Sequence, residues 1–181
     1  MKIICYGDSN TYGFDPRSYF GGQYDADCRW VDILEKNTSW EVQNWGENGR
    51  EIPAGNLEFP TLPDLLIIML GTNDLLQGAD ADCVAQRMEA FVMALSVEKE
   101  KILLVSPPPM KLGAWVSDGT LIESSAQLAE RYQTLAENLG IKFTDAGKWN
   151  TPLTFDGVHL SEEGHIRFAE EIRKEIFKWF T

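Results

Sequence analysis

Residues 2–13 read KIICYGDSNTYG, a short apolar run followed at once by Gly7, Asp8 and Ser9. The run at 3–6 predicts a buried strand. A serine at the exit of a first strand lies where open α/β sheets have their ligand crevice, at the carboxyl ends of the strands. If a helix begins just after Ser9, the free N–H groups of its first turn point toward that serine. Ser9 could equally be no more than a helix N-cap, a position that serine and aspartate often fill.

The rest of the chain alternates short apolar runs with patterns of helical spacing, separated by loops that include residues 14–28, 51–63 and 111–119. Further strands are predicted at 41–45, 64–70, 101–105 and 141–143. Helices are predicted at 29–37, 81–95, 121–139 and 161–180. The run DLLIIML at 64–70 is the most apolar and suits a central strand that is covered on both faces.

This alternation predicts an α/β fold with a parallel sheet and right-handed crossovers. We expect a flavodoxin-like, three-layer α/β/α sandwich around a five-stranded parallel sheet. The sequence has 181 residues and shows no linker, repeat or low-complexity segment, so we expect one domain over residues 1–181.

The composition is that of an ordinary globular protein, with 44% apolar and 24% charged residues. A formal net charge of −12 argues against nucleic acid and anionic membrane surfaces as partners. The three cysteines, Cys5, Cys28 and Cys83, form neither a disulfide framework nor a zinc-ligand pattern. The first residues lack the apolar core of a signal peptide, and no apolar run is long enough to span a membrane, so we expect a cytoplasmic protein.

Four segments place polar residues and glycines in loops that follow predicted strands: GDS at 7–9, NWG at 44–46, GTND at 71–74 and DGVH at 156–159. In a parallel sheet, such loops meet at one crevice. Ser9 needs a neighbouring base to act as a nucleophile, and the chain has two histidines. His159 follows Asp156 by three residues, a spacing that lets the carboxylate orient the imidazole as in a Ser-His-Asp triad. His165 lies inside the closing helix, where we expect a surface or helix-packing residue.

Acyl transfer also needs hydrogen-bond donors for the oxyanion that develops on the substrate. The backbone N–H groups of Ser9 and Gly46 and the side-chain amide of Asn73 could supply three such donors. Taken singly, Gly46 could be only a turn residue and Asn73 only a helix cap.

Ser9 in GDS, Gly46 in NWGENG, Asn73 in GTND and His159 in DGVH together resemble the four blocks of the SGNH hydrolases, also called the GDSL esterase/lipase family. The resemblance covers nearly the whole chain, and the strings DLLIIMLGTND, LLVSPPP and TDAG are similar to its arylesterase/acyltransferase branch. It implies a metal-free and cofactor-free serine esterase in which Ser9 is the nucleophile, His159 the base and Asp156 its orienting acid. Ser9, Gly46 and Asn73 would form the oxyanion hole.

Aromatic residues in the loops are candidates for the substrate pocket, since they suit a small apolar acyl or aryl group. We predict that Tyr12, Trp45, Trp115 and Phe155 line it, with Phe14 and Trp149 as further candidates, although each could instead cap the edge of the core. Short loops without an obvious lid favour short-chain acyl or aryl esters as small-molecule substrates. Acetylated sugars, lysophospholipids and thioesters are alternatives within the same chemistry, an alcohol could replace water as acyl acceptor, and the resemblance allows a homo-oligomer.

Two other functions remain open at this stage. A non-enzymatic flavodoxin-like module would hold a flavin phosphate at the first strand-to-helix loop, but it leaves His159 and Asp156 without a task. A phosphoesterase would need a metal site or a cluster of cations near the nucleophile, and Arg50 is the nearest basic candidate.

Overall fold

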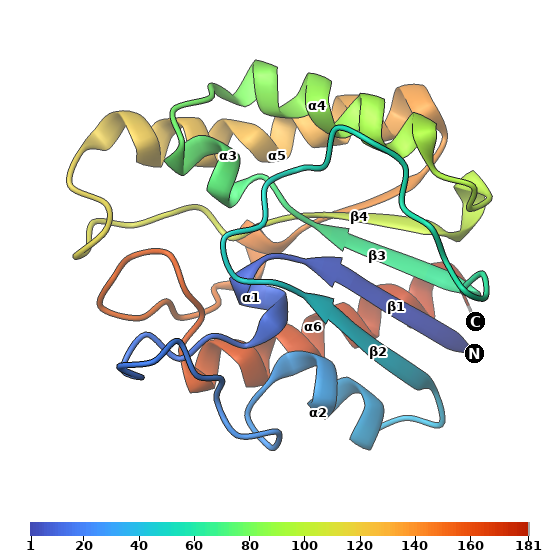
Figure 1. Cartoon of the computed structure of the whole chain (residues 1–181), viewed down its shortest axis with the longest axis horizontal. Coiled ribbons are helices and arrows are strands. Elements are labelled where there is room, and N and C mark those ends of the chain that lie inside the picture. The colour runs from blue at the N-terminus through green and yellow to red at the C-terminus, as the bar shows by residue number, and fades with distance from the viewer. Residues whose placement is uncertain (181) are drawn as a thin grey trace.

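The structure, a computed structural model, describes residues 1–180 as five strands and a series of helices (Figure 1). The strands are β1 (Lys2–Gly7), β2 (Glu41–Gly46), β3 (Leu65–Met69), β4 (Ile102–Ser106) and β5 (Lys142–Asp145). The α-helices are α1 (Ser9–Tyr12), α2 (Trp30–Lys36), α3 (Thr72–Leu76), α4 (Ala81–Ala94), α5 (Gly119–Leu139) and α6 (Glu162–Phe180). Two short 3₁₀ helices are η1 (Lys99–Lys101) and η2 (Ala146–Trp149).

All five strands are parallel and lie in the order β2-β1-β3-β4-β5. Helices α3, α4 and α5 cover one face of the sheet, and α2 and α6 cover the other (Figure 1). This arrangement confirms the predicted three-layer α/β/α fold, and the strand order is that of flavodoxin-like proteins. Because the strands are parallel, their carboxyl ends meet at one edge of the sheet.

The core consists of two apolar clusters, one on each face of the sheet. Successive strand residues point to opposite faces, so neighbours in sequence belong to different clusters. In β1, Ile4 packs with the residues of α4 and α5, whereas Ile3 packs with those of α2 and α6. All five residues of β3 and of β4 are buried, as expected for strands covered on both faces.

The predicted elements agree with the structure apart from their ends and the shortest helices. Helix α3 was not predicted because five residues are too few to show helical periodicity. Helix α5 begins at Gly119, two residues before the predicted start, because the Asp118 carboxylate accepts a hydrogen bond from the Leu121 N–H at 3.1 Å and caps the helix there. Within residues 1–180, none of the helices combines the length and the apolar character that a membrane span requires.

Candidate active site

Ser9 is the first residue of α1, the one-turn helix that follows β1 directly. Asp8 caps this helix, because its carboxylate accepts a hydrogen bond from the Asn10 N–H at 2.9 Å. Gly13 ends the helix in the left-handed region, with φ of 90°. As the first helical residue, Ser9 has a backbone N–H without an intrahelical partner, so this donor is available for a ligand.

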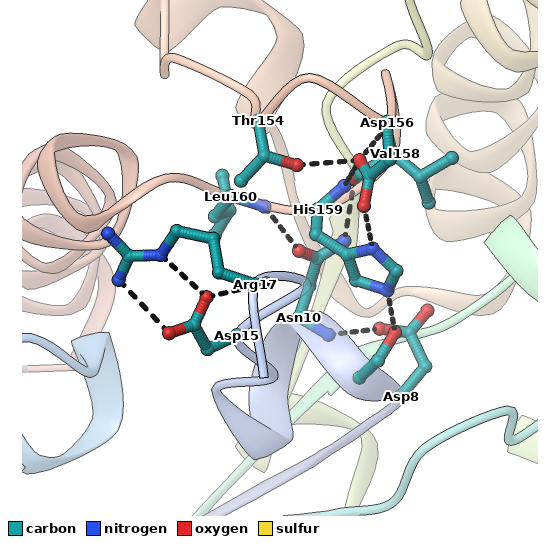
Figure 2. Close-up of polar contacts among 10 residues, drawn as sticks. Asp8, Asn10, Asp15, Arg17, Thr154, Asp156, Val158, His159 and Leu160 are labelled. Atoms are coloured by element: carbon teal, nitrogen blue, oxygen red, sulfur yellow. Dashed lines mark hydrogen bonds and ion pairs between the residues drawn. The ribbon is translucent and has the colours of Figure 1, made fainter. Parts of the chain in front are cut away.

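The structure brings Ser9, His159 and Asp156 together in one hydrogen-bonded chain. Figure 2 shows the contact between His159 and Asp156. His159 Nε2 lies 2.9 Å from Ser9 Oγ, and His159 Nδ1 lies 2.6 Å from Asp156 Oδ2. Ser9, His159 and Asp156 are all buried. A tautomer in which Nδ1–H donates to Asp156 leaves Nε2 free to accept the Ser9 proton, which is the arrangement that general-base catalysis needs.

Asp156 is held as an ionised acceptor. Its Oδ1 accepts hydrogen bonds from Thr154 Oγ1 at 2.7 Å, from the Val158 N–H at 2.8 Å and from the His159 N–H at 3.0 Å. Burial alone would raise the pKa of Asp156, but the hydrogen bonds from the His159 side chain and from these neighbouring groups lower that pKa to about 2. The carboxylate is therefore charged at neutral pH and can stabilise an imidazolium on His159.

The loop that carries His159 is fixed by the loop that follows β4. Backbone N–H groups of Lys111 and Trp115 donate to the carbonyl groups of Gly157 and Asp156 at 2.9 and 3.0 Å. In Figure 1, both loops lie at the edge of the sheet toward which the strand arrows point. The two loops thus form one rigid wall beside the carboxyl end of β1.

A hollow of about 260 Å³ opens above Ser9. Its lining residues are Ser9, Phe14, Asn48, Gly49, Asn73, Trp115 and His159. The Phe14 ring lies 4.7 Å from the His159 ring, and the Trp115 ring meets that of His159 edge-on at 5.0 Å, both measured between centroids. A larger hollow of about 610 Å³ lies between α5 and α6, beside β5, and its lining includes none of the three hydrogen-bonded residues. The hollow above Ser9, hereafter the Ser9 pocket, is therefore the candidate active site.

Asn73 lines the Ser9 pocket. Its Nδ2 donates one hydrogen bond to the Arg50 carbonyl at 3.0 Å. An amide nitrogen carries two hydrogens, so the second is available to a ligand in the pocket.

Gly46 does not line the Ser9 pocket, contrary to the prediction from sequence. Its N–H donates to Asn44 Oδ1 at 2.9 Å, so it is not free for a substrate oxygen. Gly49, three residues later in NWGENG, lines the pocket instead and has φ of 75°, in the left-handed region. The block contains two glycines, and the sequence alone does not show which of them lines the pocket, although Asn48-Gly49 is a recognisable turn signal.

Arg50 fixes the turn that carries Gly49. Its Nη1 donates to the Gly7 carbonyl at 2.8 Å and to the Trp45 carbonyl, at the ends of β1 and β2. Its guanidinium also lies over the Tyr6 ring, 4.3 Å from the centroid. Arg50 thus holds this turn against the ends of β1 and β2, and its Nη2 also forms an ion pair with Glu47 at 2.6 Å.

Of the four aromatic residues predicted to bind substrate, only Trp115 lines the Ser9 pocket. Trp45 stacks on Phe59, with centroids 5.6 Å apart, and packs against the core. Phe155 is 64% exposed and borders a separate hollow. Tyr12 ends α1 outside the pocket. The prediction that these three residues line the substrate pocket is therefore wrong.

The other aromatic candidates divide in the same way. Phe14 lines the Ser9 pocket, whereas Trp149 is buried against Phe168, with centroids 4.9 Å apart. The second histidine, His165, is also buried, and it packs edge-on against Tyr24 at 5.4 Å. Burial lowers the pKa of His165 to about 3, with smaller contributions from His159 and Arg29, so it is a neutral packing residue of α6.

A model of the GDSL-like lipase/acylhydrolase family matches residues 5–167. No curated protein sequence matches the chain. Among solved structures, a proposed arylesterase from Agrobacterium tumefaciens has 27% identity and a TM-score of 0.82, with 99% of both chains covered.

Two further structures are similar over nearly their whole length. The aryl esterase of M. smegmatis has 25% identity and a TM-score of 0.81, with 99% of both chains covered. A member of a carbohydrate acetylesterase family from Sinorhizobium meliloti has 27% identity and a TM-score of 0.80, with 98% of both chains covered.

Proposed function

The chain belongs to the GDSL-like lipase/acylhydrolase family and is a carboxylic ester hydrolase, and from that premise we propose that it cleaves short-chain acyl and aryl esters with a Ser9–His159–Asp156 triad. The single observation that carries the proposal is the buried chain of hydrogen bonds from Ser9 Oγ through the His159 ring to Asp156. Its short contacts and its burial support the roles of nucleophile, base and orienting acid for these three residues.

The proposed reaction has two steps. In the first, His159 Nε2 takes the Ser9 proton while Oγ bonds to the carbonyl carbon of the ester. The bond to the alcohol oxygen then breaks, and His159 returns the proton to that oxygen, leaving an acyl group on Ser9. In the second step, His159 takes a proton from water while the water oxygen bonds to the acyl carbon. The bond from that carbon to Ser9 Oγ then breaks, His159 returns the proton to Oγ, and the acid is released. An alcohol in place of water would give acyl transfer by the same route.

Three donors are proposed for the oxyanion: the N–H groups of Ser9 and Gly49 and the second Nδ2 hydrogen of Asn73. All three residues line the Ser9 pocket, which supports this set over one that includes Gly46. Donors held by the backbone and by a side chain that is itself hydrogen-bonded need no reorganisation when charge develops.

The size and walls of the pocket support small substrates. A hollow of about 260 Å³ with Phe14 and Trp115 on its sides suits an acetyl-type acyl group or an aromatic alcohol better than a long chain. Similar structures are described as an arylesterase and as a carbohydrate acetylesterase family member, and both kinds of ester fit this description. Acetylated sugars are therefore the second substrate class to test.

The test is a panel of p-nitrophenyl esters of rising chain length together with acetylated sugars. We expect activity to be highest on the shortest acyl groups, and we expect Ser9→Ala to lower kcat by about 10⁶-fold. Ser39→Ala, at an exposed serine before β2, is the matched control and should keep the wild-type rate. Retention of more than a few per cent of activity in Ser9→Ala would mean that another residue is the nucleophile. A yellow, flavin-containing and inactive protein would favour the binding-module alternative.

A further inference from the structure

Asn10, the residue after the proposed nucleophile, is hydrogen-bonded to the backbone on both sides of His159 (Figure 2). Its Nδ2 donates to the Val158 carbonyl at 3.2 Å, and its Oδ1 accepts from the Leu160 N–H at 2.8 Å. One carboxamide therefore pairs with this loop much as a neighbouring strand would. A leucine, which the family name GDSL has at this position, could make neither bond.

Asn10 is itself held firmly at its backbone. Its N–H donates to Asp8 Oδ1 at 2.9 Å, and its carbonyl accepts from Trp30 Nε1 at 3.0 Å. The residue is only 3% exposed, so these bonds are shielded from water. All four polar groups of Asn10 thus have partners: Asp8 and Trp30 of α2 for its backbone, and the loop that carries His159 for its side chain.

We infer that Asn10 is a positioning residue that sets the distance between Ser9 and His159, an inference that rests on the proposed function of this pair. The two residues are 150 positions apart in sequence, and their 2.9 Å contact needs a physical tie. Asn10 supplies this tie, because it follows Ser9 directly in the chain and its side chain bonds to Val158 and Leu160, the residues before and after His159. Among the described residues, no shorter path of covalent and hydrogen bonds connects Ser9 to His159, apart from their own contact.

Asn10 and Asp156 control different properties of the base. Asp156 bonds to the ring of His159, so it fixes the tautomer and the rotation of the imidazole. Asn10 bonds only to the backbone beside that ring, so it fixes how far the whole residue extends toward Ser9. Loss of Asn10 should slow proton transfer while leaving the contact between the His159 ring and Asp156 in place.

A purely structural role predicts a different pattern. Val158 C=O and Leu160 N–H are buried backbone groups, and leaving them unpaired destabilises any fold. Asn10→Leu leaves both unpaired, whereas Asn10→Ala leaves space in which water can bond to them. Water can satisfy the two groups but cannot hold them at a set distance from Ser9. Activity that returned together with stability in Asn10→Ala would therefore indicate structure alone.

The experiment compares Asn10→Leu and Asn10→Ala with Thr38→Val. Thr38 is a matched control at the opposite end of the sheet, because its Oγ1 also donates to a carbonyl, that of Leu34 at 2.8 Å, and accepts from a backbone N–H, that of Trp40 at 3.3 Å. The measurements are thermal stability, kcat and KM on p-nitrophenyl acetate, and the pH profile of kcat/KM.

We expect both Asn10 variants to lose about 10²-fold in kcat, the effect of roughly 1 Å of misplacement, with KM and the shape of the pH profile unchanged. Thr38→Val should lose stability but keep the wild-type kcat. The inference is overturned if folded Asn10→Ala has the wild-type kcat, or if Thr38→Val loses as much activity as the Asn10 variants. If Asn10→Leu does not fold, Asn10→Ala decides. Full activity in Ser9→Ala would instead overturn the proposed function on which the inference rests.

Discussion

Replacing Gly46 with alanine tests two assignments of this glycine. The structure indicates that it allows β2 to pack closely on α1, whereas its sequence block suggests a place in the oxyanion hole. A Cβ at Gly46 would lie 2.1 Å from the Tyr12 nitrogen and 2.6 Å from both the Thr11 carbonyl carbon and Tyr12 Cα. Ordinary van der Waals contact begins at 3.4 Å, so the backbones of β2 and α1 would have to separate by about 1.3 Å. The obstructing atoms are backbone atoms, which cannot rotate away as a side chain does.

The expected cost follows from that displacement. Overpacked sites typically lose 1–3 kcal/mol, and we place Gly46→Ala near the upper end, at about 3 kcal/mol, because the backbone itself must move. For a chain of this size, each kcal/mol corresponds to roughly 2–4 °C in Tm, which gives a loss of about 6–12 °C. Since Ser9 begins α1, the same shift should lower kcat by roughly 10²-fold.

The assay is thermal unfolding followed by circular dichroism, with kcat measured well below Tm. Gly55→Ala is the control, since a Cβ at this exposed glycine would meet no atom within 4 Å. A Gly46→Ala variant with the wild-type Tm would refute the close packing of β2 on α1. If that variant also lost kcat, the added methyl group would have to obstruct the substrate, which would place Gly46 at the site and contradict the structural assignment.

Three further substitutions test the site and its acid sensitivity. Asn73→Ala should lower kcat by roughly 10²–10³-fold with little change in KM, as for loss of one oxyanion donor, and an effect on KM alone would reassign Asn73 to substrate binding. Asp156→Asn should lower kcat by as much as about 10⁴-fold by favouring the wrong tautomer of His159, and a mild loss measured on the same ester would show that the acid is dispensable. His165 is charged in the unfolded chain below about pH 6.5 but neutral when folded down to about pH 3, so its burial makes stability fall as pH drops through that window. In His165→Leu, urea unfolding at pH 7 and pH 5 should therefore show a smaller difference than in the wild type, by up to about 1.4 kcal/mol per pH unit, and an equal difference would exclude His165 as a source of acid sensitivity.

The meeting of Ser9 and His159 could be predicted because it depends on topology and not on detail. A parallel sheet brings the carboxyl ends of all its strands to one edge, so residues just after strands become neighbours whatever their separation in sequence. The sequence marks these positions clearly, since buried apolar runs end abruptly in polar residues. The 3-residue spacing of Asp156 and His159 is likewise local, so their contact did not require knowledge of the rest of the fold.

The choice between Gly46 and Gly49 could not be made from sequence, because it depends on how one strand ends. β2 continues through Gly46, where close packing against α1 excludes any side chain. The chain then turns, Gly49 lines the Ser9 pocket, and Arg50 bonds back to the ends of β1 and β2. Close packing on α1 favours glycine at Gly46, whereas a φ of 75° favours it at Gly49, so the two residues look alike in the sequence for different reasons.

Which aromatic residues line the pocket depends on contacts between loops, and such contacts leave no periodic pattern in the sequence. Trp115 reaches the pocket because the loop that carries it donates hydrogen bonds to the carbonyl groups of Phe155 and Asp156. Phe14 reaches it because its N–H continues the turn of α1, donating to the Ser9 carbonyl at 3.0 Å. Each wall of the pocket is therefore tied to a member of the proposed triad, one to Asp156 and the other to Ser9. A substitution that widened the pocket by moving either loop would also disturb the triad, so changes of substrate range are best sought by replacing the ring of Phe14 or Trp115 without altering the backbone.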